Sequence, residues 1–198
     1  MIYLPLKTER LLLRDLCEED INNVYNLFSN PEVMYFLDLP HSNIEHTKRY
    51  IENLLKKYQE YPRRCYEMAV ILADTHLFIG IVSLEVETSN LRDGRSDLSY
   101  YFLPEFWHKK YATEASKTLI KFGFEVLSVN KITAGCLKCN SKSEKVMIQC
   151  NMQKEAEFKK HTQFNGEWVN RVEYAILKDE YFLKYKINNL GGIHKIIW

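Results

Sequence analysis

LPEFWHKKYATEA, residues 103–115, marks the point where a run of strands gives way to a helix. Pro104 ends a β-rich run, and from Ala112 onward the apolar residues follow a helical spacing. The loop between them feeds a helix N-terminus, where unpaired backbone N–H groups and the helix dipole favour an anion. Lys109 and Lys110 add two positive charges there. The stretch therefore predicts a phosphate-binding loop, and the plainer interpretation is an ordinary helix start with solvated lysines.

The strand and helix patterns on either side of this loop predict an α+β fold. Before the loop we expect a strand around residues 11–13, helices over 17–28 and 42–61, and strands over 65–72, 77–87 and 96–103. After it we expect a helix over 112–126, a strand over 131–137, a helix over 140–150, and strands over 152–164 and 168–178. Asn165-Gly166 predicts a tight hairpin between the last two strands, and Ser42 with Glu45 has capping-box spacing. The order β-α-α-β-β-β-α-β-α-β-β predicts a mixed, mostly antiparallel sheet flanked by helices.

The composition is that of an average globular chain and excludes several classes of protein. The 198 residues can bury one full core, and hydrophobic and charged fractions of 46% and 27% do not indicate disorder. A net charge of +1 gives no broad basic face for nucleic acid, and no apolar run predicts a membrane span. Five cysteines without a signal-peptide pattern predict reduced thiols in the cytoplasm. Cys136 and Cys139 form a lone C-x-x-C pair that lacks half of a zinc site, so no metal is predicted.

Four stretches together resemble the GNAT N-acetyltransferase superfamily, and within it the RimJ/RimL-like branch that acetylates ribosomal-protein N-termini and related amines. They are LKTERLLLRDLCEEDI at 6–21, LPEFWHKKYATEA at 103–115, NSKSEKVMIQCNM at 140–152 and GEWVNRVEYAILKDEY at 166–181. The resemblance runs from Leu6 to Tyr185. It implies a GNAT-type fold and an acetyltransferase domain over residues 1–186, followed by a C-terminal extension over 187–198.

The resemblance also implies that the loop binds acetyl-CoA, although two of the family's glycines are replaced by His108 and Lys110. Our hypothesis is that backbone N–H groups still bind the diphosphate, and that a strained lysine costs about 1 kcal/mol if its φ is positive. A backbone N–H at Phe102 or Leu103 is expected to polarise the thioester carbonyl. The remaining expected cofactor contacts are Trp107, His108, Lys109, Lys110, Tyr111, Ala112, Thr113, Asn140 and Lys145. Asn140 could equally be a helix N-cap, and Lys145 could equally be a solvated lysine.

Acetyl transfer to an amine needs a base for the ammonium proton and an acid for the departing thiolate. Asp97 is our first candidate for the base, with Glu85 and Glu87 as alternatives on the preceding strand. In many members of the superfamily a tyrosine acts as the acid, but Met147 occupies that position here, so Ser143 becomes the candidate. The plainer interpretations are a carboxylate at a strand edge for Asp97 and a helix-start hydroxyl for Ser143.

These features predict an acetyl-CoA-dependent N-acetyltransferase that transfers acetyl directly to a primary amine. The acceptor is a protein N-terminus or a small amine such as a polyamine, with no nucleic acid or membrane partner, in a monomer or homodimer. The replaced glycines and the missing tyrosine leave a second hypothesis open, a catalytically degenerate acyl-CoA-binding module that regulates or recruits. A plain interaction protein without a nucleotide is the third.

Overall fold

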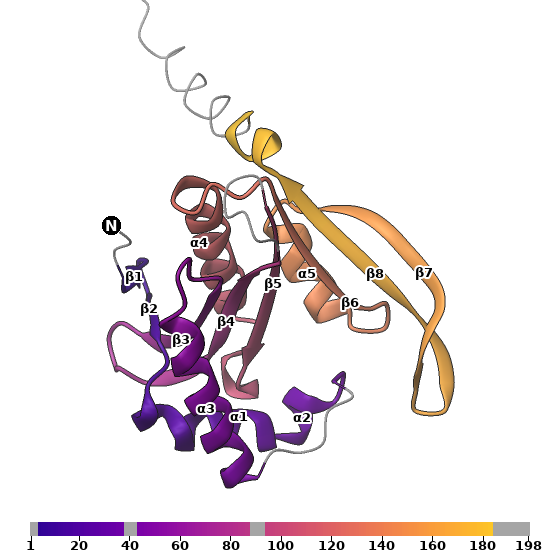
Figure 1. Ribbon diagram of the computed structural model, residues 1–198. Coiled ribbons are helices and arrows are strands. Elements are labelled where there is room, and N and C mark those ends of the chain that lie inside the picture. Colours follow the sequence, from indigo (N-terminus) through magenta and orange to yellow (C-terminus); the bar gives the residue numbers. More distant parts are fainter. Residues whose placement is uncertain (1–3, 38–42, 88–93, 184–198) are drawn as a thin grey trace, which may run out of the picture.

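A computed structural model describes residues 4–37, 43–87 and 94–183 (Figure 1). Its helices are α1 (Ile21–Ser29), α2 (Pro31–Met34), α3 (Ile44–Tyr58), α4 (Tyr111–Glu125) and α5 (Ser141–Gln149), with short 3-10 turns at Glu18–Asp20 and Pro104–Phe106. Its strands are β1 (Leu6–Lys7), β2 (Leu11–Asp15), β3 (Cys65–Leu72), β4 (Phe78–Val86), β5 (Arg95–Phe102), β6 (Lys131–Leu137), β7 (Gln153–Phe164) and β8 (Glu167–Leu177). Residues 178–183 are also helical. The expected order is confirmed, with β1 and the one-turn helix α2 as additions.

All strands form one eight-stranded sheet in the order β1-β2-β3-β4-β5-β6-β8-β7. Every neighbouring pair is antiparallel except β5 and β6, so the predicted mixed, mostly antiparallel sheet is confirmed. The parallel pair is short: only Arg95–Asp97 of β5 align with Lys131–Thr133 of β6. Both strands continue beyond these pairs, to Phe102 and Leu137, without bonding each other. A gap therefore opens in the middle of the sheet.

Helices cover both faces of the sheet and bury two apolar cores. One core joins α4 and α5 to the sheet and includes Leu84, Leu98, Leu119 and Met147. The other joins α1 and α3 to the opposite face and includes Leu27, Ile51, Ala69 and Ile81. Side chains alternate along β5, so Leu98, Tyr100 and Phe102 face α4 and α5, whereas Asp97, Ser99 and Tyr101 face the α1 and α3 side.

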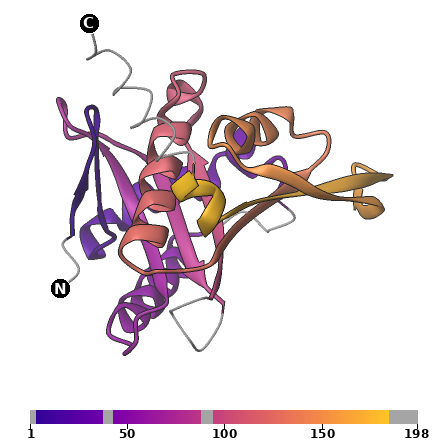
Figure 2. The ribbon, with the colours of Figure 1, turned by 90° about the horizontal axis from the view of Figure 1, so that it is seen from above.

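The β7–β8 hairpin extends away from the rest of the sheet (Figure 2). Its turn is the predicted one, because Asn165 and Gly166 have φ values of 51° and 80°, which a two-residue hairpin requires. At the tip, Phe164 stacks on Phe36 with ring centroids 5.6 Å apart and meets Tyr35 edge-on at 5.3 Å. The hairpin tip therefore contacts the segment after α2, far away in the sequence.

Helix α3 begins differently from our expectation. Asn43, rather than Ser42, is the N-cap, because its side-chain oxygen accepts the N–H of His46 at 2.9 Å. Ser42 itself lies outside the described residues. The capping-box prediction is therefore wrong by one residue, since Asn caps as well as Ser and the spacing to Glu45 alone could not separate the two.

The strands of the described residues all belong to one sheet. The C-terminal extension expected over 187–198 lies outside the described residues. Within the described part of the chain, no helix is sufficiently long and apolar to cross a bilayer.

Candidate active site

The loop between β5 and α4 presents a row of unpaired backbone donors. Within the described residues, no protein acceptor takes the N–H groups of His108 through Thr113. The first N–H near the helix start that is paired is that of Glu114, which donates to the carbonyl of Lys110 at 3.0 Å. Lys109 and Lys110 are exposed beside these donors. The loop is thus open to an anion, as the sequence predicts.

Both positions where the family has glycine adopt the left-handed conformation. His108 has a φ of 61° and Lys110 a φ of 64°. A side chain in this region costs about 1 kcal/mol relative to glycine. The loop therefore keeps the backbone path of a glycine turn despite its bulky residues.

Two contacts hold the loop against the end of β5. The indole N–H of Trp107 donates to the Phe102 carbonyl at 2.6 Å. Lys142, from the first turn of α5, places its Nζ 4.2 Å from the centre of the Trp107 ring. The sequence did not single out Lys142, because only the fold brings α5 next to Trp107. Lys142 therefore adds a third positive charge near the loop, beside those of Lys109 and Lys110.

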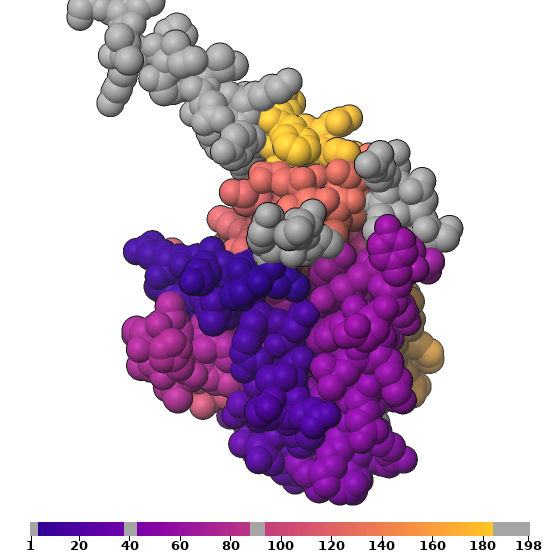
Figure 3. All heavy atoms as spheres, turned by 60° about the vertical axis from the view of Figure 1, so that its left-hand side comes forward, coloured from indigo at the N-terminus to yellow at the C-terminus, as the bar shows by residue number. Residues whose placement is uncertain are grey.

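The N-terminal strands support the start of α4. Thr8 and Arg10 donate to the carboxylate of Glu114, at 2.6 Å for the Thr8 hydroxyl and 2.8 Å for Arg10 Nε. Burial raises the pKa of Glu114, but these hydrogen bonds outweigh it and hold that pKa below its ordinary value. Figure 3 shows the side of the molecule on which the N-terminal strands, in indigo, lie beside the purple segment that includes α3. Glu114 therefore supports the start of α4.

The gap between β5 and β6 leaves main-chain groups of β5 without a strand partner. The Leu103 N–H donates to the Ile79 carbonyl at 3.0 Å, so it is already engaged with β4. N–H groups alternate between the two sides of a strand, so the Phe102 N–H points toward β6, beyond the last β5–β6 pair. Of the two candidate N–H groups for polarising a thioester carbonyl, only that of Phe102 points into the gap.

Helix α5 begins at the far side of the gap. Asn140 is its N-cap, with its side-chain oxygen accepting the Ser143 N–H at 3.1 Å, so the plainer interpretation holds for that oxygen. Ser143 Oγ lies 2.9 Å from the hydroxyl of Tyr100 on β5. Met147 is buried, at 1% exposure. Lys145 is exposed and makes no ion pair within the described residues.

Thr113 contributes to the loop through its backbone only. Its hydroxyl donates to the Gln149 side chain at 2.8 Å and so ties α4 to α5. The Tyr111 ring is likewise occupied, with the Arg10 guanidinium 4.5 Å from its centre. The expected contacts of these two residues with a cofactor therefore reduce to their amide N–H groups.

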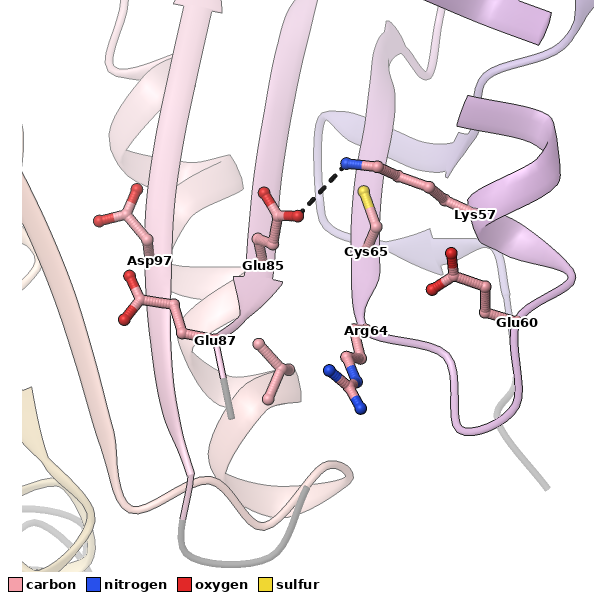
Figure 4. A pocket seen from close by; sticks show the side chains of 8 residues that line it. Lys57, Glu60, Arg64, Cys65, Glu85, Glu87 and Asp97 are labelled. Atoms are coloured by element: carbon pink, nitrogen blue, oxygen red, sulfur yellow. Dashed lines mark hydrogen bonds and ion pairs between the residues drawn. The ribbon is translucent and has the colours of Figure 1, made fainter. Parts of the chain in front are cut away.

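Two grooves meet on the α1 and α3 side of the sheet, and Glu87 and Asp97 line both. The first, of ≈ 550 Å³, lies between α3 and strands β3 to β5 (Figure 4). The second, of ≈ 450 Å³, lies toward the β7–β8 hairpin. Figure 4 shows the carboxylates of Glu85, Glu87 and Asp97 beside one another, from adjacent strands. The fold thus unites the three carboxylates that the sequence analysis proposed as bases.

Asp97 differs from the other carboxylates of the grooves. Glu85 pairs with Lys57 at 3.3 Å, and Glu87 accepts from Arg95 Nε at 2.6 Å. Asp97 has no cationic partner within the described residues and instead accepts the hydroxyls of Ser99 at 3.3 Å and Thr133 at 3.4 Å. Burial is the main cause that raises its pKa, despite these hydrogen bonds. Asp97 also forms the last aligned pair of β5 and β6, at the closed end of the gap.

Glu67 is a half-buried carboxyl group that sequence reasoning missed. It lies on β3, on the same face as Glu85, and accepts the Tyr50 hydroxyl from α3. Burial, and secondarily Glu85, raise the pKa of Glu67 to about 7. A glutamate within a strand of mostly apolar residues, CYEMAVIL, was the available signal.

One cysteine, Cys65, lines the first groove. All five cysteines are free thiols, and the buried Cys136 donates weakly to the Asn140 carbonyl at 3.7 Å. Within residues 4–37, 43–87 and 94–183, no group of three or more His, Cys, Asp or Glu side chains is arranged so that it could hold a metal ion.

The open loop and the gap in the sheet offer unpaired N–H groups that suit a donor with a diphosphate, and the carboxylate at the closed end of the gap lines two grooves, which is an arrangement typical of a group-transfer enzyme. A family model described as Acetyltransferase (GNAT) domain matches residues 10–153. The chain belongs to the GNAT acetyltransferase family.

Relatives and solved structures agree with this family. YoaA of Bacillus subtilis, an uncharacterised N-acetyltransferase, is 27% identical over 174 residues, which cover 87% of this chain and 96% of that protein. Spermidine N(1)-acetyltransferase of Escherichia coli K12 is 26% identical over 175 residues, which cover 88% and 89%. The crystal structure of a GNAT-family acetyltransferase from Bacillus anthracis superposes with a TM-score of 0.77 at 26% identity, over 89% of this chain and 100% of that one.

These findings confirm three predictions: the GNAT-type α+β fold, an N-acetyltransferase enzyme, and acetyl-CoA as its acetyl donor. The amides of the loop and the gap beside Phe102 fit such a donor, since they offer unpaired N–H groups where a diphosphate and a thioester would lie. The RimJ/RimL-like branch and the individual site residues stay predictions.

Proposed function

We propose that this enzyme transfers acetyl from acetyl-CoA directly to a primary amine, with Asp97 as the general base. The observation that carries the proposal is the position of Asp97. Asp97 lies at the closed end of the gap and lines both grooves. Its pKa is raised by burial, and it forms no ion pair within the described residues. An incoming ammonium would be attracted to this carboxylate and would lose its proton there, directly or through one water.

Acetyl-CoA supplies the acetyl group as a thioester. In the proposed site, the N–H groups of residues 108–113 bind the diphosphate, with Lys109, Lys110 and Lys142 nearby and Lys145 exposed on α5. The Phe102 N–H polarises the carbonyl, and the Asn140 amide nitrogen contacts the pantetheine arm. Ser143 assists the departing thiolate.

The acceptor we favour is the N-terminus of a polypeptide, in line with the RimJ/RimL-like motifs. The grooves alternate in charge, because Lys57, Arg95, Lys131 and Arg171 each pair with a glutamate, and they are open along the sheet. A mixed-charge groove suits an extended peptide better than a polycation, which prefers unpaired carboxylates. A polyamine is the second candidate, because a relative at 26% identity is a spermidine acetyltransferase. The five free cysteines suit a cytoplasmic enzyme.

The test is release of free thiol from acetyl-CoA with three acceptor sets: peptides with varied first residues, polyamines, and small aromatic amines. We expect turnover with peptides, and a loss of about 100-fold in kcat for Asp97→Asn. Asp74→Asn, in the exposed β3–β4 turn, is the matched control and should behave as wild type. Donor binding without turnover of any amine would instead favour the degenerate module.

A further inference from the structure

The Tyr100 side chain reaches from β5 to the first turn of α5. Its hydroxyl donates a hydrogen bond to the backbone carbonyl of Ser143 at 2.9 Å and lies 2.9 Å from the Ser143 hydroxyl. Tyr100 is half-buried and packs on the α4 and α5 core, on the opposite face of β5 from Asp97. The hydroxyl of Tyr100 is therefore on the donor side of the sheet, and the candidate base is on the acceptor side.

A departing thiolate on the donor side needs a nearby proton. Met147, one turn further along α5, carries none, and a serine hydroxyl alone is a very weak acid. A phenol is a stronger acid than an aliphatic hydroxyl, so Tyr100 is the better proton donor of the pair. Tyr100 brings this phenol to the same turn of α5 from a different element.

We propose that Tyr100 donates the proton to the leaving sulfur, and that Ser143 stabilises the phenolate that remains. This inference rests on the proposed function. As the amine nitrogen bonds to the carbonyl carbon and loses its protons to the base, the C–S bond breaks and its electron pair stays on sulfur. The Tyr100 hydroxyl gives its proton to that sulfur, and the Ser143 hydroxyl donates a hydrogen bond to the phenolate. Water returns a proton to Tyr100 when the products leave, so the net release is one proton from the acceptor ammonium.

The surroundings of Tyr100 keep its phenol protonated but also make it a weaker acid, and the Ser143 hydroxyl is the contact that acts in the opposite direction by lowering the pKa of Tyr100. Burial raises the pKa of Tyr100, and this effect outweighs the opposing hydrogen bond with Ser143. The phenol therefore stays protonated throughout the neutral range and is ready at the start of each cycle.

Tyr100→Phe tests the proposal, and the chain offers a matched control. Tyr174 on β8 likewise donates to α5, at 2.9 Å to the Glu144 carboxylate, so Tyr174→Phe removes a comparable strand-to-helix hydrogen bond. We expect kcat to fall about 100-fold for Tyr100→Phe and to stay within twofold for Tyr174→Phe, with little change in the KM for acetyl-CoA. Equal losses in both variants, or a Tyr100→Phe enzyme that keeps half of its kcat, would overturn the proposal.

Calorimetric binding of CoA and desulfo-CoA gives a readout that does not depend on turnover. Wild type should bind CoA about tenfold more tightly than desulfo-CoA, because the Tyr100 hydroxyl bonds the sulfur, and Tyr100→Phe should bind both alike. If wild type turns over no amine, the proposed function fails, and this comparison still decides whether Tyr100 contacts the sulfur. Should Tyr100→Phe fold poorly, 3-fluorotyrosine at position 100 keeps the shape and lowers the phenol pKa. A kcat that does not respond to this change contradicts proton donation.

Discussion

His108 and Lys110 hold a backbone conformation that glycine adopts without strain, with φ values of 61° and 64°. The neighbouring N–H groups remain open all the same, so the loop retains its donors at a cost in stability. Replacing glycine by His108 and Lys110 therefore costs stability but leaves the backbone of the loop in a left-handed conformation at both positions.

Lys110→Gly should raise the free energy of unfolding by about 1 kcal/mol, because it relieves the left-handed strain. Chemical denaturation measures the change. Lys109→Gly is the matched control: Lys109 lies between the two strained residues, has no positive φ, and should lose stability when replaced by glycine. If both variants lose stability alike, the strain at Lys110 does not exist in solution.

The pH profile of the reaction should report Asp97. Since burial raises the pKa of Asp97, the rate should fall with decreasing pH at a higher pH than an ordinary aspartate would produce. The sign follows from the base role, because only the ionised carboxylate accepts a proton. Asp97→Asn should flatten this acid limb of kcat/KM. An unchanged limb in Asp97→Asn would assign it to another group, with Glu67 the first to test.

At the residue scale, the pattern of the sequence led to the loop, and the family resemblance led to Asp97 and Ser143 as candidates. It could not lead to Tyr100 or Lys142, whose importance arises from contacts between β5, α5 and the loop. Glu67 was missed for a similar reason, since its raised pKa comes from burial beneath α3. The spacing of neighbouring residues in the sequence does not predict contacts between residues that are far apart along the chain.

Among the elements, the β7–β8 hairpin is the one whose position bears most directly on the acceptor. Phe158 of this hairpin lines the second groove, and its tip packs on the residues after α2. The hairpin thus forms one wall of the second groove, and its tip is held by a segment that the chain order alone would not bring near it.

Phe164→Ala should loosen this contact and raise the KM for the acceptor about 2- to 10-fold, since an aromatic pair is worth about 0.5–1.5 kcal/mol. The KM for acetyl-CoA should not change, because the donor loop lies elsewhere. Initial rates over both substrates measure the two constants. Trp168→Ala is the control, because that side chain is 57% exposed and makes no ring contact within the described residues. A rise in both KM values would instead indicate general loosening of the sheet.

Most elements followed from the sequence because their patterns are long. β3, β6 and α5 match their predicted ranges closely, and Asn165-Gly166 specified its hairpin. The short elements escaped prediction: β1 has two residues and α2 has four, too few for a period to appear. The 3-10 turn at Glu18–Asp20 likewise split a helix that was expected to begin at residue 17.

For the molecule as a whole, Glu67 should make stability depend on pH. Its pKa is raised from 4.5 to about 7 in the folded state, so the folded protein binds more protons than the unfolded chain between these values. Stability contributed by protonated Glu67 is therefore present at low pH and is lost as pH rises through about 7.

Glu67→Gln removes this titration. Relative to wild type, its free energy of unfolding should increase from pH 5 to pH 8.5 by up to roughly 3 kcal/mol. Thermal or urea unfolding at several pH values measures the difference. A difference between the two proteins that is constant across this range would show that Glu67 ionises normally in the folded state.

The three aligned pairs between β5 and β6 make the sheet two panels joined along a short seam. Strands β1 to β5 form one panel, and β6, β8 and β7 form the other. A donor bound in the gap beyond these pairs would contact both β5 and β6. We expect its binding to make the sheet more rigid, as an added strand would. Amide deuterium uptake should consequently slow on the facing edges of both panels upon loading. The absence of hydrogen bonds between the distal parts of β5 and β6 therefore predicts a sheet that is more flexible at this place without the donor than with it.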